Sequence, residues 1–232
     1  QMVHAILTAK GNTFSESPNA FFQVHNTPEK LGRTVSQVFL GVRLECAQCH
    51  QHPFENLKQE DYYAFSGFFT QVGRKKTRTG GEKVFLTVGT PLKHPRTGLE
   101  VPTAGLDRIP LKIGEHADGR QILADWMTSP KNRGFARMLV NRLWAHYLGV
   151  GLVEPIDDLR PTNPASNEPL LAALADHFID SNYDIKSLTR LILQSRVYQL
   201  DSKPNDLNRA DERHYACAPW KPIPAEVLID GI

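Results

Sequence analysis

Apolar residues recur at helical spacing in the first quarter of the chain. Between residues 26 and 50 these positions are Leu31, Val35, Val38, Phe39, Val42 and Cys46. Thr27 is followed by Pro28, and a hydroxyl residue before proline is typical of a helix start. We therefore expect a helix that begins at Pro28 and runs to His50. Pro53 stops it because proline lacks the amide donor that a helix needs.

A second helix is expected over residues 58–72, where the sequence is KQEDYYAFSGFFTQV. Its aromatic residues fall on one face. They are Tyr62, Phe65, Phe68 and Phe69. We interpret this face first as core packing, and as an aromatic wall beside a flat cofactor in the alternative.

Residues 71–117 have a different composition, rich in Gly, Pro, Thr and Lys. The stretch EKVFLTV alternates and is β-branched, which predicts a strand, and a second short strand is expected near Leu99 to Val101. Gly80 and Gly81 indicate a turn. The basic run from Arg74 to Arg78 is expected to be a solvated loop, with phosphate or polyanion binding as the alternative.

From Asp118 onward the pattern is helical again. Helices are expected over residues 118–130, 133–153, 168–182 and 184–200, with Asp184 as the cap of the last. We find no internal repeat. The predicted fold is mainly α, with two helical parts (residues 1–72 and 118–232) joined by a small β-rich or loop insert (residues 73–117).

Composition narrows the classes of function. The 232 residues carry 27 basic and 25 acidic side chains, a balance that argues against a dedicated nucleic-acid binder. No apolar run is long enough for a transmembrane helix. Three cysteines are too few for a disulfide scaffold, and Cys217 is expected to be a small buried or half-buried hydrophobe. The chain starts at Gln1 without a methionine, so we expect a fragment of a longer protein.

The segment CAQCH holds the most specific chemistry. In a helix Cys46, Cys49 and His50 share one face. A haem bound through two thioethers needs two thiols one turn apart and an imidazole beside the second, so this pattern predicts c-type haem attachment. Two alternatives stay open. Cys46, Cys49, His50 and His52 are ligands suited to zinc or iron, and a redox-active cysteine pair is the third reading.

If haem is bound, His50 is the expected proximal ligand. The candidates for the second axial position are His52, His94, Met127, Met138 and His146. A methionine there would raise the reduction potential and a histidine would lower it.

Two further groups of residues carry weaker chemistry. Arg142 and Trp144, with Asn141 and His146 beside them, are suited to a cofactor or carbohydrate surface. The loop after residue 153 contains oxygen-bearing side chains that could bind calcium, and its paired carboxylates could serve glycoside hydrolysis. These residues are Glu154, Asp157, Asp158 and Asn163. Structural roles in a helix face and in turns are the expected alternative for both groups. The chain has no nucleophile elbow, P-loop or dinucleotide fingerprint.

Residues 35–69 resemble the hallmark segment of the planctomycete cytochrome c-associated proteins, which carry two tandem domains of unknown function, fifteen-forty-nine and fifteen-fifty-three. The matching positions are Cys46, Gln48, Cys49, His50, His52, Pro53, Phe54, Asp61, Tyr62 and Tyr63. Residues 123–202 are similar to the second domain nearly throughout. The resemblance implies that the first domain lacks its N-terminal part and the second its C-terminal part.

The resemblance also implies an exported protein, periplasmic or secreted, often with a separate cytochrome domain upstream. We therefore expect a c-type haem-binding module for electron transfer or redox chemistry. Its partner would be a redox protein or that upstream domain, with no nucleic acid and no membrane span in this chain. The alternatives are a structural or interaction module with zinc or another metal, and part of an extracytoplasmic polysaccharide-processing protein. No reaction is assigned.

Overall fold

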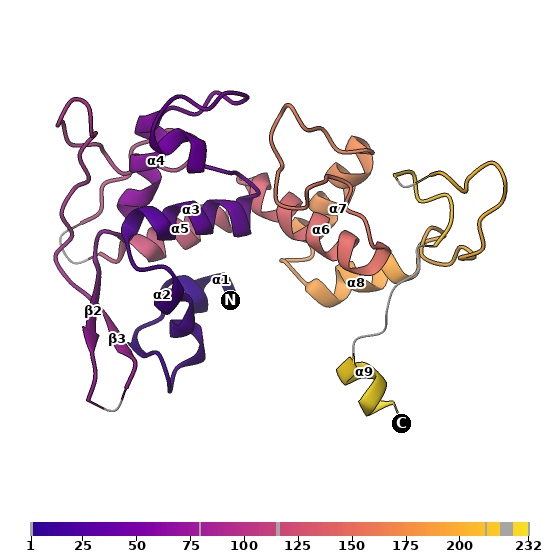
Figure 1. Cartoon of the computed structure of the whole chain (residues 1–232), viewed down its shortest axis with the longest axis horizontal. Coiled ribbons are helices and arrows are strands. Elements are labelled where there is room, and N and C mark those ends of the chain that lie inside the picture. The colour runs from indigo at the N-terminus through magenta and orange to yellow at the C-terminus, as the bar shows by residue number, and fades with distance from the viewer. Residues whose placement is uncertain (1, 79, 115–116, 212, 219–224, 232) are drawn as a thin grey trace. The chain divides into compact units, whose positions relative to one another are not determined.

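The computed structural model describes residues 2–78, 80–114, 117–211, 213–218 and 225–231. It confirms a mainly helical fold with one small sheet (Figure 1). Two compact units are present, one of Gln1–Phe135 with Arg160–Thr162 and one of Ala136–Leu159 with Asn163–Ile232. These packing units divide the chain at other places than the sequence-based boundaries do.

The first unit combines short helices with a three-stranded antiparallel sheet in the order β1-β3-β2. Its α-helices are α1 (Met2–Leu7), α2 (Ala20–Val24), α3 (Pro28–Val35), α4 (Gln59–Ser66) and α5 (Gly119–Met127). Its 3-10 turns are η1 (Ser17–Asn19), η3 (Glu45–Gln48) and η4 (Gly67–Phe69), and η2 (Ser36–Leu40) is a π turn. Its strands are β1 (Gly11–Asn12), β2 (Val72–Lys76) and β3 (Glu82–Leu86).

The predicted helix from Pro28 to His50 is wrong in its second half. Thr27 caps its start as expected, because the Thr27 side chain accepts from the Lys30 amide. The helix widens into a π turn and ends at Gly41, which is left-handed at φ 68°. Glycine takes this conformation without the steric cost that a side chain brings, and it stops helices for that reason. The cysteines therefore lie in a separate short turn.

The aromatic face of α4 and η4 forms the core of the first unit. Tyr62 is 1 % exposed, and Phe65, Phe68 and Phe69 are 0 % exposed. The Phe65 ring meets Phe68 and Trp126 edge to face, at centroid distances of 6.0 and 6.4 Å. The core interpretation is confirmed. Burial raises the pKa of Tyr62 to about 12, with nearby charges as smaller causes.

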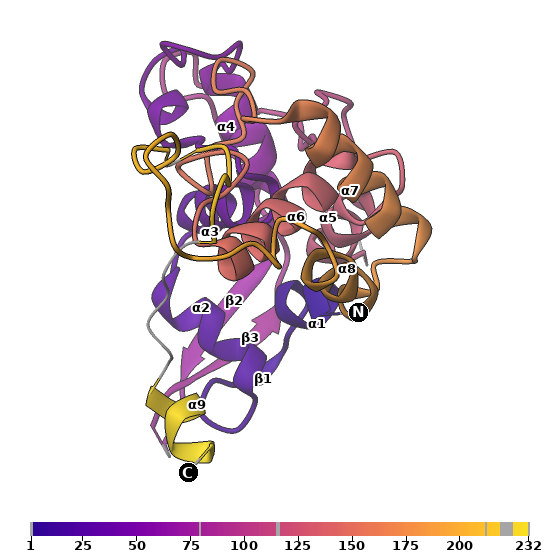
Figure 2. The same cartoon turned by 90° about the vertical axis from the view of Figure 1, so that its right-hand side faces the viewer.

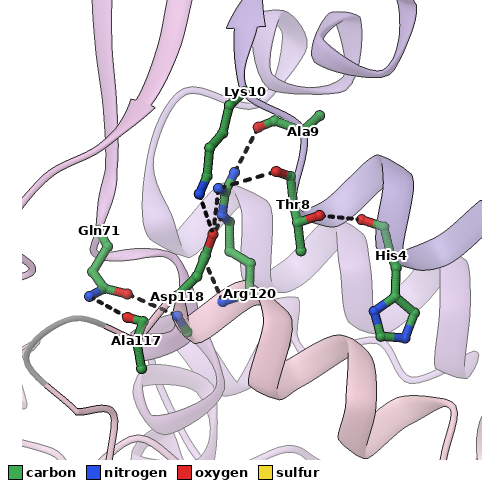
Figure 3. Close-up of polar contacts among 9 residues, drawn as sticks. His4, Thr8, Ala9, Lys10, Gln71, Ala117, Asp118 and Arg120 are labelled. Carbon is green, nitrogen blue, oxygen red and sulfur yellow. Dashed lines mark hydrogen bonds and ion pairs between the residues drawn. The ribbon is translucent and has the colours of Figure 1, made fainter.

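A buried ion pair connects the start of α5 to the end of α1 (Figure 3). Arg120 is 0 % exposed and donates to both carboxylate oxygens of Asp118, at 2.9 and 2.8 Å, and to the Ala9 carbonyl at 3.0 Å. Lys10 approaches the same carboxylate at 3.4 Å. Burial alone would raise the pKa of Asp118, but hydrogen bonds and charge from Arg120, with Lys10, lower it overall. Segments more than a hundred residues apart are thereby joined.

The insert is a β-hairpin followed by loops. EKVFLTV contains β3 as expected, and Gly80 and Gly81 form the turn at φ 87° and 76°. The basic run is mostly strand β2 rather than a loop, so that prediction is wrong. Antiparallel pairing with β3 over Val72 to Lys76 explains the difference, because the β2 backbone groups that face β3 find hydrogen-bond partners there. The second predicted strand is replaced by an isolated bridge between Lys93 and Glu100.

The second unit confirms the three helices expected at residues 133–153, 168–182 and 184–200. They are α6 (Arg133–Leu148, which begins in the first unit), α7 (Glu168–Asp180) and α8 (Ile185–Leu193), of which α6 and α8 end earlier than expected. A further short helix, α9 (Ala225–Asp230), follows. Asp184 caps α8 by accepting from the Lys186 and Ser187 amides. The turn before it is left-handed at Asn182 and Tyr183. Apolar side chains of α6, α7 and α8 are buried, among them Trp144, Leu171, Phe178, Leu188 and Ile192.

Candidate functional site

The two cysteines of the CAQCH segment lie on a 3-10 turn and are exposed free thiols. A 3-10 helix has three residues per turn, so positions three apart lie on the same side. Cys46 is within the turn, and Cys49 is its C-terminal cap in right-handed conformation. The thiols are therefore one turn apart on one side, as predicted, although the predicted α-helix is absent.

Burial of the other side of the turn orients the thiols. Leu44 and Ala47 are each 0 % exposed and pack into the first unit. Cys46 lies between these two residues in sequence and Cys49 follows Ala47. Both cysteines are on the opposite, exposed side of the turn. The apolar pair thus works as an anchor that presents the thiols to solvent.

Polar contacts to two helices hold the same turn. Arg33 of α3 makes an ion pair with Glu45 at 2.5 Å. Gln59 of α4 donates from Nε2 to the Gln48 carbonyl at 2.6 Å. The turn is therefore tied at one end to α3 and at the other to α4, the helix that carries part of the aromatic core.

His50 has the hydrogen bonding that a metal ligand requires. Its side chain is exposed, and Nδ1 lies 2.7 Å from the Gln51 carbonyl. A carbonyl oxygen only accepts, so Nδ1 carries the proton and the Nε2 lone pair stays available. Metal-bound histidines in proteins commonly donate their second ring nitrogen to a backbone carbonyl in this way.

His52 has the opposite arrangement. It is 7 % exposed, and its Nδ1 accepts from the Phe54 and Glu55 amides at 3.2 and 3.1 Å. An amide only donates, so the proton of the neutral ring is on Nε2. While this loop persists, His52 has no lone pair to give to a metal.

His94, 42 positions later, repeats the arrangement of His52. It is 7 % exposed, and its Nδ1 accepts from the Arg96 and Thr97 amides at 3.2 and 3.3 Å. His52 donates its amide to the Leu57 carbonyl, and His94 donates its amide to the Leu99 carbonyl, both at 2.8 Å. We call residues 52–57 the His52 loop and residues 94–99 the His94 loop.

This short repeat corrects the expectation that the chain has no internal repeat. The shared pattern is His-Pro-x-x-x-Leu, HPFENL in one loop and HPRTGL in the other. The signal is short and is separated by unrelated sequence. It has a physical meaning, because an acceptor at the first position binds the amides two and three residues later, as an Asx turn does.

The other predicted axial ligands lie in the two cores or, for His146, on the surface of the second unit. Met127 is 0 % exposed in the first unit and Met138 is 1 % exposed in the second. His146 is exposed and its ring packs edge to face on Tyr147 at 4.9 Å. Within the part of the chain that the structure describes, no three His, Cys, Asp or Glu side chains gather as a metal site.

An arginine that the sequence analysis did not single out clamps the His52 loop. Arg108 donates from Nε and from a terminal nitrogen to the two carboxylate oxygens of Asp61, each at 2.9 Å, and it also donates to the Asn56 carbonyl. Its backbone is left-handed at φ 62°. The hydrogen bond to Asp61 raises the pKa of Arg108. A second cation, Arg160, lies 5.2 Å from the centre of the exposed Phe54 ring.

The residues around Trp144 serve the fold of the second unit. The Asn141 amide donates to the Val153 and Ile156 carbonyls at 2.9 and 3.0 Å, and its oxygen accepts from the Val153 amide. Trp144 is 2 % exposed and meets the Tyr215 ring edge to face. This packing fits the structural alternative better than a stacking surface.

The acids of the following loop also have structural contacts. Glu154 accepts from the Gly151 amide at 2.6 Å, and the Asn163 amide donates to the Glu154 and Asp158 carbonyls at 3.0 and 2.9 Å. Glu154 lines a hollow of about 750 Å³ together with Asp211, Tyr215 and Cys217. Cys217 is half-buried at this hollow, within the expected range of burial.

Comparison with known families identifies two domains in tandem. Residues 5–74 match the model of PSCyt2, a protein of unknown function (DUF1549). Residues 119–232 match the model of PSD1, a protein of unknown function (DUF1553). The chain therefore carries a PSCyt2 domain followed by a PSD1 domain, in the tandem order that the resemblance implied. No curated protein and no solved structure matches it.

The packing of the chain crosses the boundary between these domains. The PSD1 match begins at Gly119, the first residue of α5. Nevertheless α5 is part of the first packing unit, where Arg120 binds the Ala9 carbonyl inside the PSCyt2 match. The first helix of the PSD1 match is therefore part of the core of the first unit, the same core into which the cysteine turn packs. No helix in the described residues has the length and apolar character needed to cross a bilayer.

Proposed function

We propose that this chain is a c-type haem-binding module in which Cys46 and Cys49 form the thioethers and His50 is the proximal ligand. One observation carries the proposal. The two exposed thiols lie one 3-10 turn apart, and the histidine beside them has its Nδ1 proton committed to a carbonyl and its Nε2 lone pair exposed. Bound haem would supply one-electron redox chemistry.

The residues around the motif act as its support. Leu44 and Ala47 anchor the turn, Arg33 and Gln59 tie it to two helices, and the Gln51 carbonyl selects the tautomer of His50. The His52 loop then turns the chain back toward α4. In this proposal His52 is a positioning residue, not a ligand, because its Nδ1 is committed to two amides. Covalent haem attachment places the protein outside the cytoplasm, with a redox protein or an upstream cytochrome domain as its partner.

The test is coexpression with cytochrome c maturation machinery. The proposal expects a Soret band and a haem mass adduct that survives denaturation. Cys46→Ala with Cys49→Ala removes the adduct, whereas Cys217→Ala, the matched control at the third cysteine, keeps it. His50→Ala alters the Soret spectrum, and His52→Asn keeps both the adduct and the spectrum.

Two results would overturn the proposal. One is a colourless protein without an adduct, in cells that mature a control cytochrome. The other is stoichiometric zinc that is lost with Cys46 or Cys49, which would favour the structural metal alternative.

A further inference from the structure

The tip of the β2–β3 hairpin carries a dense group of cations. The strands pair Lys75 directly with Lys83, and like charges in such opposed positions destabilise a sheet. Lys76 and Arg78 follow along the same hairpin, and all four side chains are exposed. In the described residues none of the four lies within ion-pair distance of a carboxylate. The fold therefore maintains unneutralised charge at a cost in stability.

The nearby carboxylates do not neutralise the positive charge of the hairpin tip. Glu82 is at 3.1 Å from Arg74, so this pair neutralises itself. Glu16 is exposed and lies beside Gly11 of β1. The cations of the hairpin tip outnumber both acids together.

An exposed aromatic ring lies against the same tip. Phe14 is 72 % exposed, although its ring packs on the turn at Gly80 and Gly81. A Cβ at Gly81 would come within 2.6 Å of this ring, so the glycine is needed for the contact. The Thr13 amide fixes the segment by donating to the Glu82 carbonyl at 2.9 Å. The ring is thus held in place with most of its surface in water, and burying that surface against an apolar environment would be favourable.

A polar hollow of about 530 Å³ lies beside the tip, between the end of α2 and the hairpin. Gln23, Asn26, Arg74 and Lys76 are among its lining residues. Glu82 lines the hollow as well and is paired there with Arg74, so Lys76 and the two amides are the groups that suit a phosphate-bearing headgroup.

The tip lies at the end of the first unit opposite to α4, as both views show (Figures 1 and 2). The cysteine turn, which is tied to α4, therefore lies away from the hairpin tip. A partner that covers Phe14 and the lysines would leave the thiols accessible.

We propose that the hairpin tip docks this protein on an anionic lipid surface, with Phe14 entering the headgroup region and Lys75, Lys76, Arg78 and Lys83 facing anionic lipids. Cations around one exposed apolar side chain are the signature of interfacial binding. Nucleic acid is less suited as the partner. A single-stranded polymer is bound in a groove that follows its backbone, with several aromatic platforms, whereas the tip is a projecting turn with the Phe14 ring against it. The proposal does not depend on haem.

The test is sedimentation with vesicles at low salt. Vesicles of phosphatidylcholine mixed with about one third phosphatidylglycerol should bind the protein, and vesicles of phosphatidylcholine alone should not. Lys75→Gln with Lys83→Gln is expected to weaken binding about fivefold for each lysine. Phe14→Ser is expected to weaken it about tenfold. Raising the salt should release the protein, because screening shortens the reach of these charges.

Matched controls distinguish the effect of the hairpin tip from the effects of the protein's net charge and of exposed apolar side chains elsewhere. Lys93→Gln with Lys131→Gln removes the same net charge from exposed positions elsewhere, and Val88→Ser removes an apolar side chain that is 91 % exposed. Both should bind like the parent protein. Equal binding to neutral vesicles, no binding to either kind, or unchanged binding of the lysine variant would overturn the proposal. Binding of duplex DNA through the same residues, at the same salt and tighter than to vesicles, would also overturn it.

Discussion

The His52 loop and the His94 loop share the hydrogen bonds of their histidines and differ in backbone and surroundings. Both bury a histidine whose Nδ1 accepts two amides, and both close on a leucine carbonyl. In the His94 loop, Gly98 is left-handed at φ 71° and donates its amide to the His94 carbonyl, whereas Asn56 at the same position of the His52 loop is not left-handed. The His52 loop is clamped by Arg108 and follows the cysteine turn, and the His94 ring lies 3.5 Å from the Glu60 carboxylate. The same histidine hydrogen bonds thus occur in two different loops. A histidine near a cysteine motif is therefore not a ligand by proximity.

The largest effect should come from a residue that lies outside both loops. Arg120→Met keeps the buried volume but leaves the Asp118 carboxylate without its main partner, so about 3 kcal/mol of stability is lost. Both loops should lose amide-exchange protection together, because they share the core of the first unit. Urea unfolding and hydrogen exchange check this result. Loss of protection in one loop alone would contradict it.

The same ion pair predicts an acid dependence. The pKa of Asp118 is lowered below 3.8, so its stabilisation is present above that value and declines as the pH falls through the lowered pKa. Unfolding midpoints between pH 7 and pH 2 should therefore fall more for the parent protein than for Asp118→Asn. Equal slopes for the two proteins would show that this carboxylate has no linkage to folding.

Removing either histidine should have the next largest effect. His52→Ala and His94→Ala each leave two amides without their acceptor, which costs about 2 kcal/mol. His52→Asn and His94→Asn should regain most of it, because asparagine accepts from the same amides in an Asx turn. Hydrogen exchange at Phe54, Glu55, Arg96 and Thr97 is the measurement. Rescue in one loop only would break the equivalence of the two.

The Arg108 clamp should separate the loops. Arg108→Ala removes the paired hydrogen bonds to Asp61, and it should cost about 1 kcal/mol because the side chain is partly exposed. Exchange should increase in the His52 loop and stay unchanged in the His94 loop. Arg108→Gly is the matched variant. It loses the same contacts but should be about 1 kcal/mol more stable than the alanine variant, because glycine tolerates φ 62°.

The smallest effect is expected at Glu60. Its carboxylate lies near His94, but the Glu60 side chain is 60 % exposed, and pairs of this kind contribute less than about 0.5 kcal/mol. Glu60→Gln should leave unfolding and exchange in both loops unchanged. A loss as large as that of His94→Ala would mean that the carboxylate, and not the two amides, holds this histidine.

Local patterns were sufficient for much of the fold. Thr27, Pro28 and Asp184 predicted helix starts that the structure confirms, and alternation in EKVFLTV predicted β3. Apolar periodicity failed at Gly41, where the spacing continues through a left-handed residue that ends the helix. Periodicity records which side chains are buried, and it does not record how the backbone reaches them.

Part of the candidate site could be predicted from the sequence and part could not. The identity and spacing of Cys46, Cys49 and His50 are properties of the sequence, and the 3-10 turn preserves the spacing that the motif needs. The sequence does not tell which histidine can bind a metal, since His50 and His52 are two positions apart and have opposite tautomers. A tautomer depends on which backbone groups face the ring, and those come from the loop as it folds.

By itself, then, the sequence determined the order of the elements, the tandem family, the aromatic core and the spacing of the thiols, because each depends on neighbours along the chain. Tertiary structure decided the pairing of Arg120 with Asp118 and the α1 segment, the clamp of Arg108, and the placement of Phe14 on the hairpin turn. These contacts join residues far apart in sequence. Their partners are selected by packing, which no local pattern encodes.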